Sequence, residues 1–149
     1  MSDVQGCTIV VCEDDPAMTR IFQFLLRQQG IRNVFTAATG AEALAATRKH
    51  KPDLLLLDMM LPDRDGLSVL MDLKNDETTR AIPVIVVSGK EAQNQVSQAM
   101  AAGAIDYVIK PFEPMELGVR IKTFLSTIRS ASGSEPTAGS PPAASGGAR

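Results

Sequence analysis

Charged and hydroxyl side chains follow four apolar segments of this chain, each at the point where the segment ends. Glu13, Asp14 and Asp15 follow the first segment, Asp58 follows a second, and Ser88 and Lys110 follow two later ones. Carboxylates gathered in one place repel one another and raise one another's pKa unless they share a cation. An oxygen-only ligand set suits Mg²⁺, which keeps several of its waters and favours a phosphate as a further ligand. The residue types therefore indicate a divalent-metal site beside a nucleophilic carboxylate.

The same residues suit phosphoryl transfer. A carboxylate that attacks phosphorus forms an acyl phosphate, and the reaction chiefly requires positioning and neutralisation of charge. We expect Asp58 to be the acceptor, with Mg²⁺ held by Asp14 and Asp58. Lys110 would bind a second phosphoryl oxygen as a point charge, and the Ser88 hydroxyl would donate to a third.

These side chains can meet only if the apolar segments are neighbouring strands of one sheet. Apolar runs alternate strictly with helical patterns, and this order indicates parallel strands joined by right-handed crossovers in a doubly wound α/β fold. Ligands of such folds bind outside the carboxyl ends of the strands. The expected strands are Thr8–Cys12, Asn33–Thr36, Asp53–Asp58, Ile82–Val87 and Ile105–Ile109. The expected helices are Pro16–Gly30, a segment ending at His50, Leu67–Asn75, Glu91–Ala102 and a segment beginning at Pro114.

Local signals mark where several of these helices begin. Asp15 precedes Pro16 and is expected to cap the first helix, and Thr39 and Glu42 form a capping box for the second. Asp63 and Asp65 are interpreted as turn formers ahead of Gly66.

The chain of 149 residues is long enough for one domain. Its net charge of -2 lacks the basic excess of nucleic-acid and membrane-surface binders, and no apolar stretch approaches the ~20 residues that span a bilayer. We therefore expect a cytoplasmic protein without direct nucleic-acid binding or membrane insertion. Cys7 and Cys12 are expected to be free and buried. The domain is expected over residues 5–129, and the Ser/Pro/Gly/Ala-rich segment 130–149 as a disordered tail or linker.

Four motifs together resemble the response-regulator receiver family of two-component signalling, to which the chemotaxis regulators belong. They are Glu13-Asp14 after an apolar strand, Leu57-Asp58-Met-Met-Leu-Pro62 with Asp65-Gly66, Val87-Ser88-Gly89, and Lys110-Pro111-Phe112. The resemblance runs from about Thr8 to Ile128 in the right order and spacing. It implies a flavodoxin-like (βα)5 sheet of five parallel strands in the order 2-1-3-4-5.

The resemblance also implies roles for individual residues. Asp58 would accept a phosphoryl group from a phosphohistidine on a sensor histidine kinase or phosphotransfer protein. Asp14 would be the main acidic ligand of Mg²⁺, Glu13 would assist through water, and the backbone carbonyl of Met60 would also contact the metal. The domain would be a signalling module that catalyses only its own phosphorylation and dephosphorylation.

A second group of roles concerns the switch. Ser88 would shift toward the phosphoryl group, Lys110 would bridge it, and the Lys110–Pro111 bond would be cis. Tyr107 matches the family's switch aromatic, whose ring moves inward as the hydroxyl residue shifts. An output protein, which the sequence does not identify, would bind the surface of the fourth helix, fifth strand and fifth helix. The bulk of Met60 beside the acceptor predicts a comparatively long-lived phosphorylated state.

Simpler explanations exist for single residues. Asp14 could cap a helix, Ser88 could be a turn residue, Lys110 could be a solvated lysine, and Tyr107 could be ordinary strand packing.

Three other functions are alternatives for a chain of this pattern. A haloacid-dehalogenase-like phosphohydrolase needs a second acid where Met60 stands, and a flavodoxin-like cofactor binder would not place three acids in its phosphate loop. A pseudo-receiver usually has a broken acidic pocket, whereas the key positions here are intact. A stand-alone receiver and the first domain of a longer regulator both fit the sequence.

Overall fold

The computed structural model describes residues 4–133. Its elements in chain order are β1 (Thr8–Cys12), α1 (Pro16–Gln28), β2 (Asn33–Ala37), α2 (Gly40–His50), β3 (Leu54–Asp58), α3 (Gly66–Lys74), β4 (Val84–Ser88), the 3-10 helix η1 (Lys90–Gln95), α4 (Val96–Ala102), β5 (Asp106–Ile109) and α5 (Pro114–Gly133). The strict alternation of strands and helices confirms the α/β class expected from the sequence.

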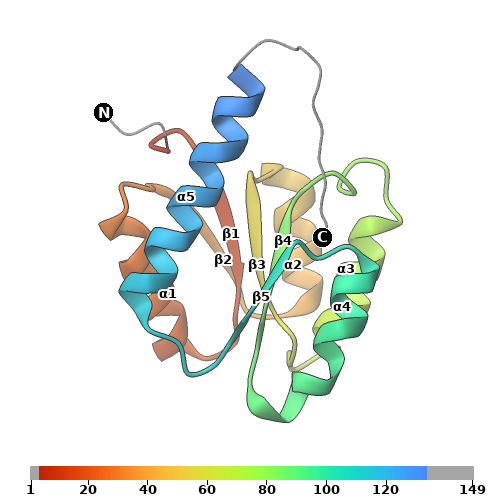
Figure 1. Ribbon diagram of the computed structural model, residues 1–149. Helices are drawn as coiled ribbons and strands as arrows, with labels where there is room; N and C mark the ends of the chain where they lie inside the picture. Colours follow the sequence, from red (N-terminus) through yellow and green to blue (C-terminus); the bar gives the residue numbers. More distant parts are fainter. Residues whose placement is uncertain (1–3, 134–149) are drawn as a thin grey trace.

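The five strands form one parallel sheet in the order β2-β1-β3-β4-β5, which confirms the expected topology. Helices α1 and α5 cover one face of the sheet, and α2, α3 and α4 cover the other (Figure 1). The central strands β3 and β4 are buried along their whole length, as expected of parallel strands covered on both faces.

Each face of the sheet has its own hydrophobic core. On the first face, Phe22 of α1 and Ile121 of α5 pack on the alternate strand residues Val11 and Leu56. On the second face, Leu70 of α3 and Ala99 of α4 belong to the same cluster as Val10 and Leu57, strand residues that point to the opposite side from Val11 and Leu56. Cys7 and Cys12 lie one in each core, both buried and neither in a disulfide, as expected.

Helix starts agree with the capping signals. Asp15 caps α1 through a hydrogen bond from Ala17 N to its Oδ1 at 3.0 Å, with Pro16 as the first helical residue. Thr39 caps α2 by accepting from Glu42 N. The reciprocal half of the capping box differs, because Glu42 accepts from the backbone of Ala38 instead of Thr39.

The expected α-helix over Glu91–Ala102 is wrong in its first half. Lys90–Gln95 form a 3-10 helix, and α4 itself is confined to Val96–Ala102. Gly89 offers no side-chain cap to this segment, and Ala92 N donates to Gly89 O across the shorter 3-10 spacing. Ala92 supplies the buried contact of η1, so little packing energy favours a regular α-helix there.

At the carboxyl end of the chain, α5 continues past residue 129 to Gly133. The expected tail from residue 134 onward lies outside the described residues. Within the described part of the chain, no helix combines the length and hydropathy needed to span a membrane.

Candidate functional site

Strand register brings the acidic residues of β1 and β3 together. The two strands pair in parallel up to Cys12 opposite Leu57, so the next position along each is Glu13 and Asp58. Both side chains are almost completely buried, with 2% and 6% of their side-chain area exposed. Asp14, which follows Glu13, is exposed to solvent. Carboxylate oxygens of these three residues lie within 4.8 Å of one another.

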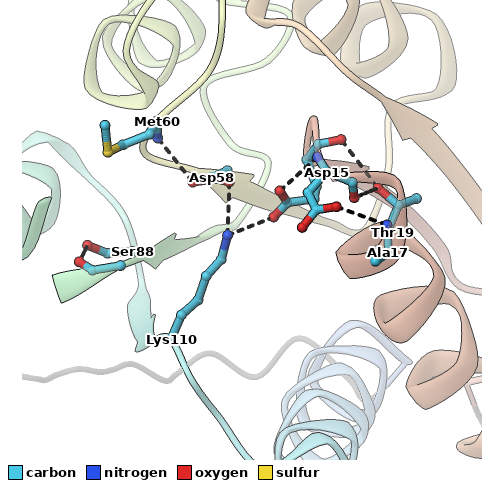
Figure 2. A network of polar contacts seen from close by, with 9 residues as sticks. Asp15, Ala17, Thr19, Asp58, Met60, Ser88 and Lys110 are labelled. Atoms are coloured by element: carbon cyan, nitrogen blue, oxygen red, sulfur yellow. Dashed lines mark hydrogen bonds and ion pairs between the residues drawn. The ribbon is translucent and has the colours of Figure 1, made fainter. Parts of the chain in front are cut away.

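Lys110 reaches into this cluster from the end of β5. Its Nζ donates to Asp58 Oδ2 at 3.1 Å and to Glu13 Oε1 at 3.0 Å (Figure 2). Lys110 N also donates to Ser88 O, which fixes the residue beside β4, and the following bond to Pro111 is cis. The ammonium group therefore neutralises part of the buried negative charge, and Lys110 is not a solvated surface lysine.

The charges in the pocket are strongly coupled. Burial raises the pKa of Glu13 to about 7, and the charge of Asp58 adds to this effect while the Lys110 bond opposes it. Burial acts to lower the pKa of Lys110, but its bonds to Glu13 and the charge of Asp58 outweigh burial and raise it. Lys110 therefore stays charged, whereas Glu13 has a pKa close to neutral pH.

The backbone after β3 fixes the second oxygen of Asp58. Met60 N donates to Asp58 Oδ1 at 3.0 Å (Figure 2), and Gly66 N donates to Met59 O at 2.8 Å. A Cβ at position 66 would lie 2.4 Å from Asp58 O, so this close return of the chain requires glycine. The Met60 side chain itself is 52% exposed beside the acceptor.

Among the described residues, the side chains of Ser88 and Tyr107 make no hydrogen bond to the acids or to the Lys110 ammonium. The Ser88 hydroxyl, fully buried at the end of β4, donates to Gly89 O at 2.9 Å. Tyr107 lies on β5, opposite Val86 in register, and is 42% exposed. The structure thus brings the side chains of Glu13, Asp14, Asp58 and Lys110 together. It leaves the side chains of the two expected switch residues outside these contacts. The direction of the Met60 carbonyl toward a metal stays a prediction.

One acidic residue near the site does more than the sequence suggested. Asp63, interpreted as a turn former, accepts from Gly40 N at 2.7 Å and from Ala41 N at 3.0 Å, both at the start of α2. Its neighbour Asp65 caps α3 by accepting from Ser68 N. An Asp directly before a helix, such as Asp65, predicts a local cap on that helix. No local sequence signal predicts that Asp63 accepts from a helix start more than twenty residues earlier in the chain.

A flavodoxin-like sheet that carries acids and a lysine at this edge is typical of signalling domains that handle phosphoryl groups. The response regulator receiver domain profile matches residues 9–122, and the chain therefore belongs to this family of two-component signalling domains. Receiver domains accept a phosphoryl group on an aspartate and bind Mg²⁺.

Individual relatives agree with this assignment. The chain is 36% identical over 124 residues to the probable transcriptional regulatory protein TcrX of Mycobacterium tuberculosis, covering 83% of this chain and 52% of that protein. The chain thus spans about half the length of the curated relatives that it matches.

Solved structures show the same fold. A putative response regulator from Chloroflexus aurantiacus matches with a TM-score of 0.73 and 32% identity, over 80% of this chain and 98% of that one. The receiver domain of the sensor histidine kinase PA1611 from Pseudomonas aeruginosa matches with a TM-score of 0.72 and 29% identity, over 81% and 98% of the two chains. The latter structure has a magnesium ion coordinated in its active-site cleft.

Proposed function

We propose that Asp58 is the residue on which this receiver domain accepts its phosphoryl group. The observation that carries the proposal is the position of Lys110 Nζ, bonded to both Asp58 and Glu13 within a cluster of three carboxylates. An amine fixed there lies where it can bind an oxygen of a phosphoryl group on Asp58. Asp58 is held by Lys110 and by the backbone amide of Met60, and Glu13 is held by Lys110 and by the backbone amide of Asp15. The place of Asp58 in the receiver-family motif Leu57-Asp58-Met-Met-Leu-Pro62 favours it as the acceptor.

Mg²⁺ is the metal that fits this pocket. Its donors are carboxylate oxygens of three residues, and the single lysine bonded to two of them leaves negative charge that a cation can neutralise. We assign Asp14, Asp58 and the Met60 carbonyl as its ligands, with Glu13 assisting through water. When bound, Mg²⁺ supplies neutralisation of charge on the transferring phosphoryl group.

The proposed donor is a phosphohistidine on a sensor histidine kinase or a phosphotransfer protein. A carboxylate oxygen of Asp58 attacks phosphorus, the P–N bond breaks, and the departing imidazole nitrogen keeps the electron pair. The product is an acyl phosphate on Asp58. Return to the free carboxylate requires attack by water, which we propose the domain promotes on itself. We assign it no other catalytic activity.

The output of the reaction would be a rearrangement of the α4–β5–α5 surface. A phosphoryl group on Asp58 offers the Ser88 hydroxyl a charged acceptor in place of Gly89 O, and a bond to a charged group is stronger than one to a neutral carbonyl. Movement of Ser88 would leave space that the exposed ring of Tyr107 can occupy. A groove of about 480 Å³, lined by Val96, Met100, Tyr107 and neighbouring residues, lies on this surface. We propose that it contacts an output domain or protein.

The test is incubation with Mg²⁺ and a small phosphodonor such as acetyl phosphate, followed by intact-protein mass spectrometry. The wild type should gain the mass of one phosphoryl group, and Asp58→Asn should gain none. Asp65→Asn is the matched control, because it alters an exposed acid of the same loop that caps α3. Equal labelling of Asp58→Asn and the wild type would overturn the assignment.

A further inference from the structure

The connection between β3 and α3 is fastened at its middle to a different helix. Asp63 is exposed, yet its two carboxylate oxygens accept separately from Gly40 N at 2.7 Å and from Ala41 N at 3.0 Å. These hydrogen bonds lower the pKa of Asp63, which therefore stays ionised at neutral pH. The side-chain stem of the next residue, Arg64, lies against Gly40, where an added Cβ would be only 2.7 Å from Arg64 Cγ. The loop and the start of α2 are therefore in direct contact.

The same connection determines the position of Asp58. Met60 N holds Asp58 Oδ1, Met60 forms an isolated bridge with Asp65, and Gly66 N holds Met59 O. The segment is short and closed at both ends by these bonds. A displacement of its middle would therefore move Met60, and with it the amide that orients the Asp58 carboxylate.

The start of α2 is also bonded to the end of β1. Glu13 N donates to Ala37 O at 2.9 Å, just ahead of the helix, and the Cys12 thiol donates to Thr39 O at 3.6 Å. The segment that leads from β2 into α2 therefore contacts both parts of the pocket. Ala37 and the cap residue Thr39 bond the end of β1, and the first turn of α2 bonds the loop after Asp58 through Asp63.

We propose that Asp63 is a positioning residue of the phosphoryl site, which sets the Asp58 loop against the acids of β1 by tying it to the first turn of α2. The inference rests on the function proposed above for Asp58 and adds a residue that touches neither phosphoryl group nor metal. Thr39 already caps α2 through Glu42 N. The bonds from Asp63 are thus additional to the helix's own cap, and their particular effect is to place the loop.

The experiment compares Asp63→Ala with Thr39→Ala. Both variants remove a side-chain cap from the same helix end, but only the first releases the loop. The first readout uses metal-free protein and is the rate of hydrogen exchange at the Met60 amide, monitored by NMR. The second is Mg²⁺ affinity, measured by titration calorimetry. Asp63→Ala should speed exchange of Met60 and weaken Mg²⁺ binding by about tenfold, as loss of an outer-sphere partner typically does.

Thr39→Ala should lower thermal stability and leave both readouts close to wild type. Asp63→Asn keeps one acceptor oxygen and should fall between wild type and Asp63→Ala; it also carries the comparison if Asp63→Ala does not fold. Equal values of both readouts for the Asp63 variants and Thr39→Ala would overturn the proposal and leave Asp63 as a simple cap. Absence of phosphoryl transfer to wild-type Asp58 would instead count against the proposed function, because amide exchange and Mg²⁺ binding are measured without a phosphodonor.

Discussion

The two halves of the sheet's carboxyl edge are organised differently. At the β1–β3 half, Glu13 and Asp58 are buried and share Lys110, and the Met60 amide holds the other Asp58 oxygen. At the β4–β5 half, the Ser88 hydroxyl donates to the adjacent Gly89 carbonyl, and Tyr107 is 42% exposed. The first half is preorganised for chemistry, so little has to move before phosphoryl transfer. The second half is held by contacts that a new charge on Asp58 can replace.

This difference explains how a local reaction could alter a distant surface. A switch needs one part that stays fixed and another with two arrangements of similar free energy. The short α4 and the 3-10 turn of η1 lie on the β4–β5 half, and neither is closed by a side-chain cap. We therefore expect the elements that move to lie beside Ser88, while the acids of β1 and β3 stay fixed.

Loss of Lys110 should have the largest effect on the preorganised half. Lys110→Ala removes the cation shared by Asp58 and Glu13, and we expect phosphorylation by acetyl phosphate to slow on the order of a hundredfold, as for loss of one preorganised electrostatic contact. Lys110→Arg keeps the charge but not the geometry and should lose less activity. Rates follow from mass spectrometry over time. An unchanged rate in Lys110→Ala would show that the shared ammonium contributes nothing to the reaction.

The movable half can be tested with an internal probe. Tyr107 is the only tyrosine, and the chain has no tryptophan, so intrinsic fluorescence reports directly on this ring. Beryllofluoride with Mg²⁺ should change the emission of the wild type, and Ser88→Ala should lose most of this change. The rate of phosphorylation of Ser88→Ala should fall only on the order of tenfold, because the variant loses one hydrogen bond to the charged phosphoryl group. A fluorescence change in Ser88→Ala as large as in the wild type would show that the response of Tyr107 does not depend on the Ser88 hydroxyl.

The sequence predicted the preorganised half better than the movable half. Apolar runs ending in acids or lysine are enough to bring Asp58, Glu13 and Lys110 to one edge, because parallel strands all end there. The family resemblance assigns the main metal role to Asp14, and this stays a prediction. The structure adds that Glu13 is buried and bonded to Lys110. Strand alternation contains this signal, since Glu13 follows Ile9 and Val11 at spacing two.

Other features depend on contacts that no local pattern encodes. The cap that Asp63 places on α2 joins residues more than twenty positions apart, and the hydroxyl direction of Ser88 depends on which acceptor is nearest in the folded chain. The 3-10 geometry of Lys90–Gln95 likewise reflects weak packing and a missing cap. Helical periodicity alone cannot distinguish it from an α-helix.

The raised pKa of Glu13 predicts a pH dependence in the preorganised half. Its pKa is about 7 in the metal-free protein, against an ordinary value of 4.5. Protons therefore compete with Mg²⁺ below neutrality, and Mg²⁺ affinity should rise severalfold between about pH 6 and pH 8. The pKa of Glu13 is higher in the folded chain than its ordinary value, so protonated Glu13 stabilises the metal-free fold. This contribution to stability is lost as the pH rises from 4.5 to about 7.

Glu13→Gln separates this effect from other groups. It should bind Mg²⁺ more weakly than the wild type at pH 8, with an affinity that changes much less with pH. Calorimetric titrations at several pH values provide the measurement. A pH dependence that is as steep in Glu13→Gln as in the wild type would assign the competing proton to another group.

The smallest expected effect concerns the boundary between the two halves. The Met60 side chain is 52% exposed next to Asp58, while its backbone amide holds the acceptor. Met60→Asn keeps the amide but exchanges an apolar side chain for one that can hydrogen-bond a water near the acyl phosphate. We therefore expect the phosphorylated variant to decay severalfold faster in magnesium buffer, with unchanged Tyr107 fluorescence in beryllofluoride. Met71→Asn, at a comparably exposed methionine on α3, controls for surface polarity. Slower decay of Met60→Asn would show that the apolar side chain does not shield the acyl phosphate.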